Sequence, residues 1–249
     1  MIRKNSIRSF VSTGLLLAFA ATCAAKEFSV LAIGDSQWAG ISFLRSATDP
    51  VLLDLSPHRR SKAQQATGSM LVFIRQRIDP ETGLPVPPPK SSTPEPKPPV
   101  PVARVTLPAD MPTVVLMFMP RTTPGADGIE FDVVPIDDSL EAFPADTLRV
   151  LNLTPVSLHA HIGERQVEIK PGLSPALSLL EVRKPEATVV PFALSVSQAG
   201  AKLRTLYRGP IEAHANSRTL VTVHPPGTPD SRKMRVSIVL QTVEIPTPK

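Results

Sequence analysis

Cysteine and aromatic residues are scarce in this chain of 249 residues. It has one tryptophan, Trp38, one tyrosine, Tyr207, and one cysteine, Cys23, which lies near the N-terminus. Beyond residue 25 there is therefore no thiol for a disulfide, a thiolate metal site or a blue-copper centre. Because aromatic residues make up 4% and hydrophobic residues 42%, we expect cores built from valine, leucine, isoleucine, alanine and methionine.

Long helices are also disfavoured, because the chain contains 29 prolines. An interior proline removes a backbone hydrogen bond and clashes with the preceding turn of a helix. Short runs of β-branched and large apolar residues, bounded by turn-forming residues, recur along the sequence instead. The sequence predicts an all-β protein of two tandem β-sandwich units, of the immunoglobulin-like or cupredoxin-like kind.

The first 25 residues have the pattern of a cleaved secretory signal peptide. A basic segment with Arg3, Lys4 and Arg8 precedes the short apolar run 14–21, and small residues follow up to Ala25. The apolar run is well short of the roughly 20 residues that span a bilayer. Cleavage after Ala25 predicts a periplasmic or secreted protein without a membrane span.

Lipidation of Cys23 is an alternative use of the same leader. A bacterial lipoprotein has its lipidated cysteine at this kind of position, usually after a leucine three residues earlier and a small residue directly before. Here those two positions hold Ala20 and Thr22. The sequence alone leaves the two forms of processing open.

The charge of the mature chain gives no sign of a nucleic-acid ligand. Removing the three positive charges of the leader leaves 24 Lys and Arg residues against 22 Asp and Glu residues. Nucleic-acid-binding proteins instead carry clustered positive charge that contacts phosphates. We expect no nucleic-acid partner.

Fourteen runs carry the strand pattern, seven on each side of residue 136. We assign 26–136 to the first unit and 137–249 to the second, and we expect the polar stretch 59–67 to be a loop. Residues 147–169 hold three runs separated by turn formers, which predicts a meander. The expected strands are 28–33, 38–44, 51–55, 69–75, 102–107, 113–119, 129–134, 147–151, 156–162, 166–169, 188–196, 202–208, 218–223 and 234–243.

The segment 79–101 interrupts the first unit and holds ten of the 29 prolines. Its composition predicts an extended, solvated, polyproline-like insertion. Such a segment can serve as a docking ligand for another domain, or it can be a plain exposed loop.

The two halves can be aligned, which indicates a tandem repeat. The run SVLAIGDS from Ser29 resembles LRVLNLTP from Leu148, and VLLDLSP at residue 51 corresponds to VEIKPG at residue 167. The run TVVLMFMPRTTPGAD from Thr113 matches TLVTVHPPGTPDSRK from Thr219. The order of strands and turns agrees, with the proline-rich segment as an insertion in the first copy.

The motif Gly34-Asp35-Ser36 follows an apolar strand and resembles the first block of the SGNH (GDSL-type) hydrolases. That resemblance implies Ser36 as a nucleophile, activated by a histidine from an Asp-x-x-His motif near the C-terminus. No aspartate in this chain has a histidine three positions later, and the Gly-x-Asn-Asp block of the family is absent. A hairpin turn is the simpler interpretation of Gly34-Asp35.

Two histidines, His159 and His161, alternate on one predicted strand, so their imidazoles point to the same face. They could hold one metal ion together with His214, His224 or Glu168. A pair of solvent-facing histidines is the simpler interpretation.

Two further clusters have a structural interpretation. Met117 and Met119 alternate within a continuous apolar run, which predicts a buried strand rather than a copper site. The acidic residues Asp137, Asp138 and Glu141 lie where the halves join, as a solvated linker, a hinge or a weak calcium site would.

The leader, the proline-rich loop and the segments FPADTLRVLNL, LYRGPI and NSRTLVTV are together similar to uncharacterised exported proteins of Verrucomicrobia and Planctomycetes. That resemblance implies no activity and no site residues. We therefore predict a non-catalytic binding module of the cell envelope without a cofactor, whose partner is an envelope protein or a glycan. The alternatives are a serine hydrolase using Ser36 and a metal-binding protein using His159 and His161.

Overall fold

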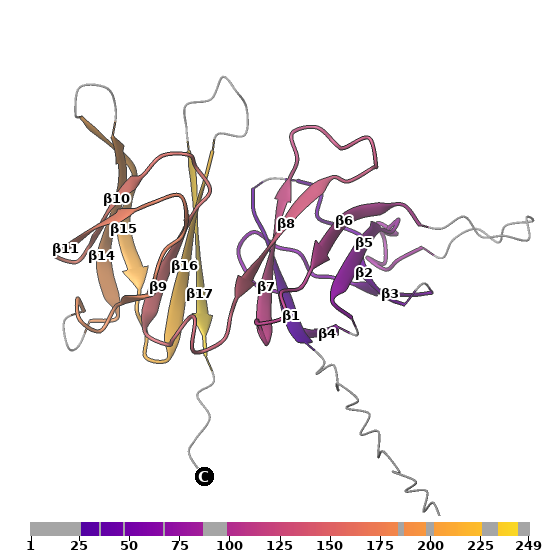
Figure 1. Cartoon of the computed structure of the whole chain (residues 1–249), viewed down its shortest axis with the longest axis horizontal. Helices are drawn as coiled ribbons and strands as arrows, with labels where there is room; N and C mark the ends of the chain where they lie inside the picture. Colours follow the sequence, from indigo (N-terminus) through magenta and orange to yellow (C-terminus); the bar gives the residue numbers. More distant parts are fainter. Residues whose placement is uncertain are drawn as a thin grey trace, which may run out of the picture.

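The computed structural model describes residues 26–34, 36–46, 48–66, 68–86, 99–183, 187–197, 202–225 and 234–243. These residues form strands and turns only, without a helix, and the strands build four sheets. The sheets stack as two β-sandwiches that lie side by side (Figure 1). The predicted all-β fold of two sandwich units is confirmed.

The first sandwich has one sheet in the order β4-β1-β7-β8 and a second in the order β3-β2-β5-β6. Side chains from both sheets fill its core, including Phe28, Phe43, Phe73 and Phe118, all at most 1% exposed. Alternate residues of each strand point into this core because the side-chain period of a strand is two. The strands are β1 (Lys26–Ala32), β2 (Ile41–Ser46), β3 (Asp49–Leu52), β4 (Gln64–Ala66), β5 (Met70–Arg75), β6 (Pro101–Thr106), β7 (Thr113–Pro120) and β8 (Phe131–Asp137).

The second sandwich pairs a sheet in the order β12-β9-β16-β17, with β13 also on β9, against a sheet in the order β11-β10-β14-β15. Leu148, Leu158, Phe192 and Val221 lie in its separate core. The strands are β9 (Thr147–Asn152), β10 (Leu158–Ile162), β11 (Arg165–Ile169), β12 (Gly172–Leu173), β13 (Leu177–Ser178), β14 (Val189–Ser197), β15 (Leu203–Glu212), β16 (Ser217–His224) and β17 (Arg235–Thr242).

Both sandwiches follow the same strand order. In each, the first strand pairs in parallel with a later strand, β1 with β7 and β9 with β16, and an antiparallel strand, β8 or β17, completes that side of the sheet. The opposite sheet of each sandwich consists of two hairpins, β2–β3 with β5–β6 and β10–β11 with β14–β15.

Three expectations about local structure are wrong. Residues 147–169 do not form a meander, because β9 pairs with β16 in one sheet and β10–β11 lie in the other. The polar stretch 59–67 contains β4, which pairs with β1 although its sequence, QQA, lacks apolar periodicity. The described strands number eight and nine rather than seven and seven, since β4, β12 and β13 are too short to leave a pattern.

The proline-rich segment is also not extended throughout. Residues 79–86 turn back on themselves, with a bridge between Ile78 and Pro85 and a hydrogen bond of 2.8 Å from Val86 N to the carbonyl of Arg77. Backbone hydrogen bonds between 77 and 86 therefore replace the extended conformation expected there, while residues 80–84 are exposed as expected. The expectation for residues 87–98 falls outside the described part of the chain.

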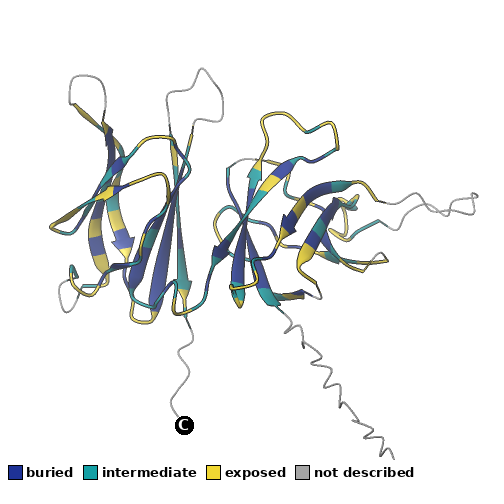
Figure 2. Ribbon diagram, in the orientation of Figure 1, coloured by how far each residue is buried: buried dark blue, intermediate teal, exposed yellow. Residues whose placement is uncertain are grey.

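The two sandwiches meet through their inner sheets, and we call this contact the seam. Strands β1 and β7 bury both faces: one face lies in the first core, and the other packs against β9, β16 and β17 (Figure 2). Strands covered on both sides have continuous apolar runs rather than alternation. The buried seam residues are Leu31, Ile33, Val115, Met117, Ile136, Phe143, Leu151, Leu220 and Val239.

Candidate functional site: the groove between the sandwiches

One end of the seam is closed by a buried ionic cluster. Asp138, directly after β8, accepts hydrogen bonds from Arg60 at 2.6 Å and from Arg218 at 2.7 Å through the same oxygen, Oδ2. Arg60 also donates to Ser29 at 2.6 Å, and both arginines donate to the side-chain oxygen of Gln241. The cluster joins groups from both sandwiches and from the segment between them.

The Arg218 side chain is 3% exposed, so its charge depends on these partners. Its Nη1 donates to the carbonyls of Asp138 and Phe143 at 3.1 and 2.8 Å, and its guanidinium lies 4.9 Å from the Phe143 ring centroid. Burial lowers the pKa of Arg218 and the carboxylate of Asp138 opposes that shift. An arginine at this depth, with an acceptor for each of its three guanidinium nitrogens, fixes how the two inner sheets face each other.

The opposite end of the seam is open and forms a groove of about 460 Å³. Its floor is the end of the seam's apolar core: Ile33 directly after β1, Met119 from β7 and Leu153 after β9. Ile33 is buried, whereas Met119 and Leu153 are half-buried. We call this hollow the seam groove.

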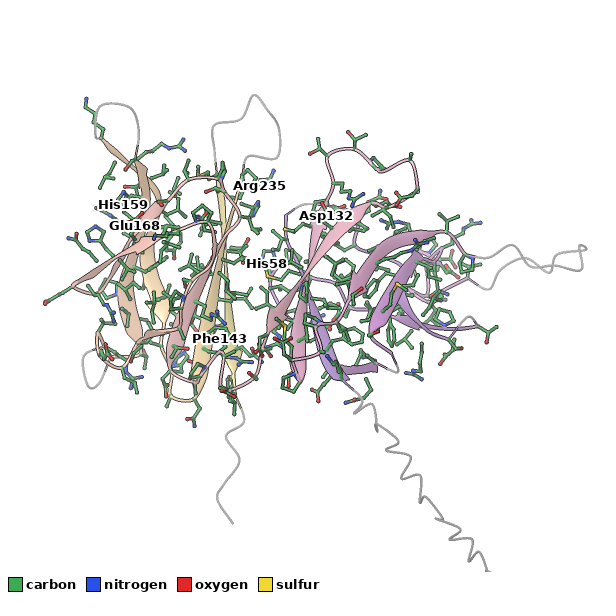
Figure 3. All side chains as sticks on the ribbon, in the orientation of Figure 1. His58, Asp132, Phe143, His159, Glu168 and Arg235 are labelled. Carbon is green, nitrogen blue, oxygen red and sulfur yellow. The ribbon has the colours of Figure 1, made fainter. Side chains whose placement is uncertain are left out.

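Charged side chains from both sandwiches form the rim of the seam groove. On the first sandwich, Arg121 binds Asp132 through Nε at 2.8 Å and Nη2 at 2.7 Å. On the second, His224 and Arg235 face each other across β16 and β17. Figure 3 shows Asp132 and Arg235 on opposite sides of the seam. Two guanidinium groups and one carboxylate therefore stand above an apolar floor.

A second hollow, of about 400 Å³, lies on the outer sheet of the second sandwich. His161, Ala193 and Arg208 form one row across β10, β14 and β15, and the small Ala193 leaves a depression between the two basic residues. Pro191 and Pro210 continue the depression along the strands. This outer hollow belongs to one sheet face and has no second wall from another unit.

Of the Gly34-Asp35-Ser36 motif, Gly34 lies at the seam groove. Gly34 has a φ of +80°, a left-handed conformation that favours glycine, and it lines the groove. Ser36 is exposed, and Asp35 falls outside the described residues. His159 binds Ser197 at 2.9 Å and His214 binds Glu212 at 3.2 Å, so these two histidines have other partners.

The predicted histidine pair lies on the outer sheet, with His159 opposite Glu168 on the neighbouring strand (Figure 3). His214 and His224 lie elsewhere, after β15 and at the end of β16. Across the residues that the structure describes, no three His, Cys, Asp or Glu side chains gather as a metal site requires.

Both methionines and the acidic residues have structural positions. Met117 is fully buried in the seam and Met119 is on the groove floor. Asp138 is buried in the ionic cluster, so the expectation of a solvated linker is wrong for this residue. Asp137 accepts a hydrogen bond from Ser139 N at 2.9 Å, and Glu141 is exposed.

Sequence reasoning missed the rim residues Arg121, Asp132 and Arg235 and the clustered Arg60 and Arg218. One signal was available: Arg218 opens a run whose remaining residues are apolar or threonine, so a charge there had to be paired. The rim residues stand in ordinary turns and strand ends, and only the packing of the two units brings them together.

No protein-family model matches the chain, and no curated protein matches it either. None of the described residues forms a helix long and apolar enough to cross a membrane.

Proposed function

We propose that the protein is an exported, non-catalytic binding module of the cell envelope that holds its ligand in the seam groove. The observation that carries the proposal is the groove itself, an apolar floor with convergent polar groups where two units meet. Ligand sites are typically hollows of about 300–1,000 Å³ with this composition, and they favour such junctions. The volume of about 460 Å³ falls in that range.

The ionic cluster at the other end of the seam supports the same proposal. A ligand site needs walls that stay in position, because ordering them on binding costs affinity. The apolar seam and the bonds of Arg60 and Arg218 to Asp138 join the two walls of the groove. An envelope protein or a glycan stays the expected partner class for a module of this kind.

A photo-crosslinking experiment tests the location of the ligand. A photoreactive amino acid replaces Thr122, which is exposed on the groove rim, and in a matched variant it replaces Thr205, which is exposed on the outer sheet. After irradiation of the producing cells, the Thr122 variant should carry an adduct of defined mass that the Thr205 variant lacks. Adducts that are absent at Thr122, or identical at both positions, would contradict the proposal.

Export is part of the proposal and has its own test. The leader of 25 residues should be absent from the protein in the envelope, with a loss of about 2.5 kDa. N-terminal sequencing of that protein should begin at Lys26. A blocked, lipidated Cys23 at the N-terminus would instead support anchoring through the same leader.

We further propose that the two sandwiches arose by duplication. Their shared strand order and the parallel pairs β1–β7 and β9–β16 support this idea. The seam groove would then lie between two copies of one ancestral unit, with a rim that has diverged on each side.

A further inference from the structure

We infer that β17 is a dimerisation edge, at which the protein pairs with β17 of a second copy in an antiparallel, two-fold arrangement. The partner is another molecule of this chain, and the two inner sheets of the second sandwiches join into one continuous sheet. This interface is separate from the ligand site of the seam groove and does not depend on it. Three features of the described residues support it: the character of the sheet edges, the direction of the free backbone groups, and the self-matching sequence of β17.

Strand β17 lacks the features that protect the other sheet edges from pairing. Short strands, prolines, charges and bulges discourage the pairing of an edge strand with another chain. Among the described edges, β4, β12 and β13 have two or three residues, β3, β6, β8 and β15 contain a proline, and β11 carries Arg165 and Glu168. Strand β17 has eight residues without proline, glycine or bulge, and its one charge, Arg235, is at its first position.

The free backbone groups of β17 belong to every second residue. Val243 N donates to the carbonyl of Asn216 at 2.7 Å, directly beyond the end of the register of β16 and β17. Because hydrogen-bonded pairs alternate along an antiparallel ladder, the odd-numbered residues of β17 bond to β16. Within the described part of the chain, β17 has no strand partner besides β16. The N–H and C=O groups that point to the free edge are those of Val236, Ile238, Leu240 and Thr242.

The side chains of β17 are also less covered than those of its neighbour. Seven of the eight residues of β16 are buried, whereas on β17 only Val239 is. Val236 and Ile238 pack against the core of the second sandwich but are only partly buried. A further strand beside β17 covers these side chains, since neighbouring strands shield each other's side chains on the same face.

Two antiparallel copies of β17 match each other in the register centred on Val239. Opposed residues of antiparallel strands point to the same face of the sheet, so even-numbered residues must oppose even-numbered ones. Ile238 then lies opposite Leu240 of the second copy, on the face of the second core, and Val239 meets its own copy on the seam face. No two charges are opposed, and Arg235 stays outside the paired residues at the groove rim. Apolar cross-strand pairs of this kind stabilise a sheet.

The mass of the mature protein in solution tests the dimer. Sedimentation velocity and light scattering should show a reversible dimer, with twice the monomer mass, at concentrations below about 1 mM. Leu240→Pro removes an N–H that points to the free edge and leaves the bonds to β16 in place, so it should abolish the dimer. Leu203→Pro, at the first residue of the edge strand β15, is the matched control and should leave the dimer intact. Thermal unfolding followed by circular dichroism checks that both variants are folded.

Cysteine pairs test the register without a proline, because the chain contains no cysteine beyond residue 25. In the register centred on Val239, Thr242 lies opposite Val236 of the second copy. Opposed positions of neighbouring strands are close enough for a disulfide. On oxidation, an equal mixture of the Thr242→Cys and Val236→Cys variants should give a cross-linked dimer, whereas each variant alone should stay unlinked.

Each measurement has a result that overturns the inference. A monomer at every concentration up to about 1 mM would contradict dimerisation. A dimer that survives in folded Leu240→Pro, or that Leu203→Pro weakens equally, would place the interface away from β17. No cross-link in the mixture would exclude the antiparallel register. A cross-link in Thr242→Cys alone would indicate parallel strands and contradict the two-fold pairing described above.

Discussion

Arg60 of the first sandwich and Arg218 of the second share one acceptor, the Oδ2 oxygen of Asp138, at 2.6 and 2.7 Å. Asp138 belongs to the segment that joins the sandwiches, so its carboxylate connects this segment to both of them. Side chains of Arg60, Asp138 and Arg218 are 15%, 6% and 3% exposed. Ion pairs this deep are costly to break, because the remaining charges stay buried without a partner.

Replacing Asp138 with asparagine should therefore destabilise the protein strongly. The amide keeps one acceptor but loses the charge that two buried guanidinium groups need, and we expect a loss of about 3–5 kcal/mol in the free energy of unfolding. Urea unfolding followed by Trp38 fluorescence and by circular dichroism measures this loss.

The matched control is Asp132→Asn, which removes the carboxylate bound to Arg121. That pair is 35% and 55% exposed, so its loss should cost at most about 1 kcal/mol. Equal effects of Asp138→Asn and Asp132→Asn would contradict a structural role for the buried cluster.

A second prediction concerns Gly40, which follows the Gly34-Asp35-Ser36 motif. Its φ is +79°, and a Cβ atom there would lie 2.2 Å from the carbonyl oxygen of Gln76. Gly40→Ala should cost more than about 2 kcal/mol, since it combines a left-handed backbone with a backbone clash. Gly68→Ala is the control, because a Cβ at Gly68 has open space around it, and it should change stability by less than about 1 kcal/mol. Thermal unfolding of both variants measures these effects. Equal midpoints would contradict the left-handed conformation and the close backbone contact at Gly40.

A third prediction concerns catalysis at Ser36. Because the chain lacks the Asp-x-x-His motif that supplies the base in the SGNH hydrolases, a fluorophosphonate probe should not label the mature protein. Intact mass spectrometry after incubation with the probe gives the answer directly. Labelling that disappears in Ser36→Ala, with the fold retained, would contradict the proposed binding module and support a serine hydrolase.

Much of the fold could be predicted from the sequence because its long strands carry local signals. Runs such as 113–119 combine β-branched and large apolar residues between turn formers, and they become β7 almost residue for residue. Strand pairing carries no such signal: β9 and β10 are separated by a short turn but belong to opposite sheets. The short β4 is a strand because the edge of β1 offers it backbone partners.

The candidate site could not be predicted, because it exists only where two units pack together. Ile33 and Met119 come from the first sandwich, and Leu153 and Arg235 from the second. Each of them is an ordinary apolar or charged residue near a strand end. The histidine pair stood out in the sequence because of its spacing, yet both residues lie on β10 in the outer sheet, and Figure 3 shows His159 far from the seam.

The methyl signal of Met119 offers the most direct test of the seam groove as the ligand site. In mature protein labelled with ¹³C at its methionine methyl groups, Met119 reports the groove floor, and Met70, 62% exposed on β5, reports the distant surface of the first sandwich. The variant Met119→Leu assigns the groove signal. On titration with an extract of the producing cell's envelope, the Met119 signal should shift and saturate while Met70 stays in place. A Met119 signal that no fraction moves, or shifts confined to Met70, would contradict a ligand site between the two sandwiches.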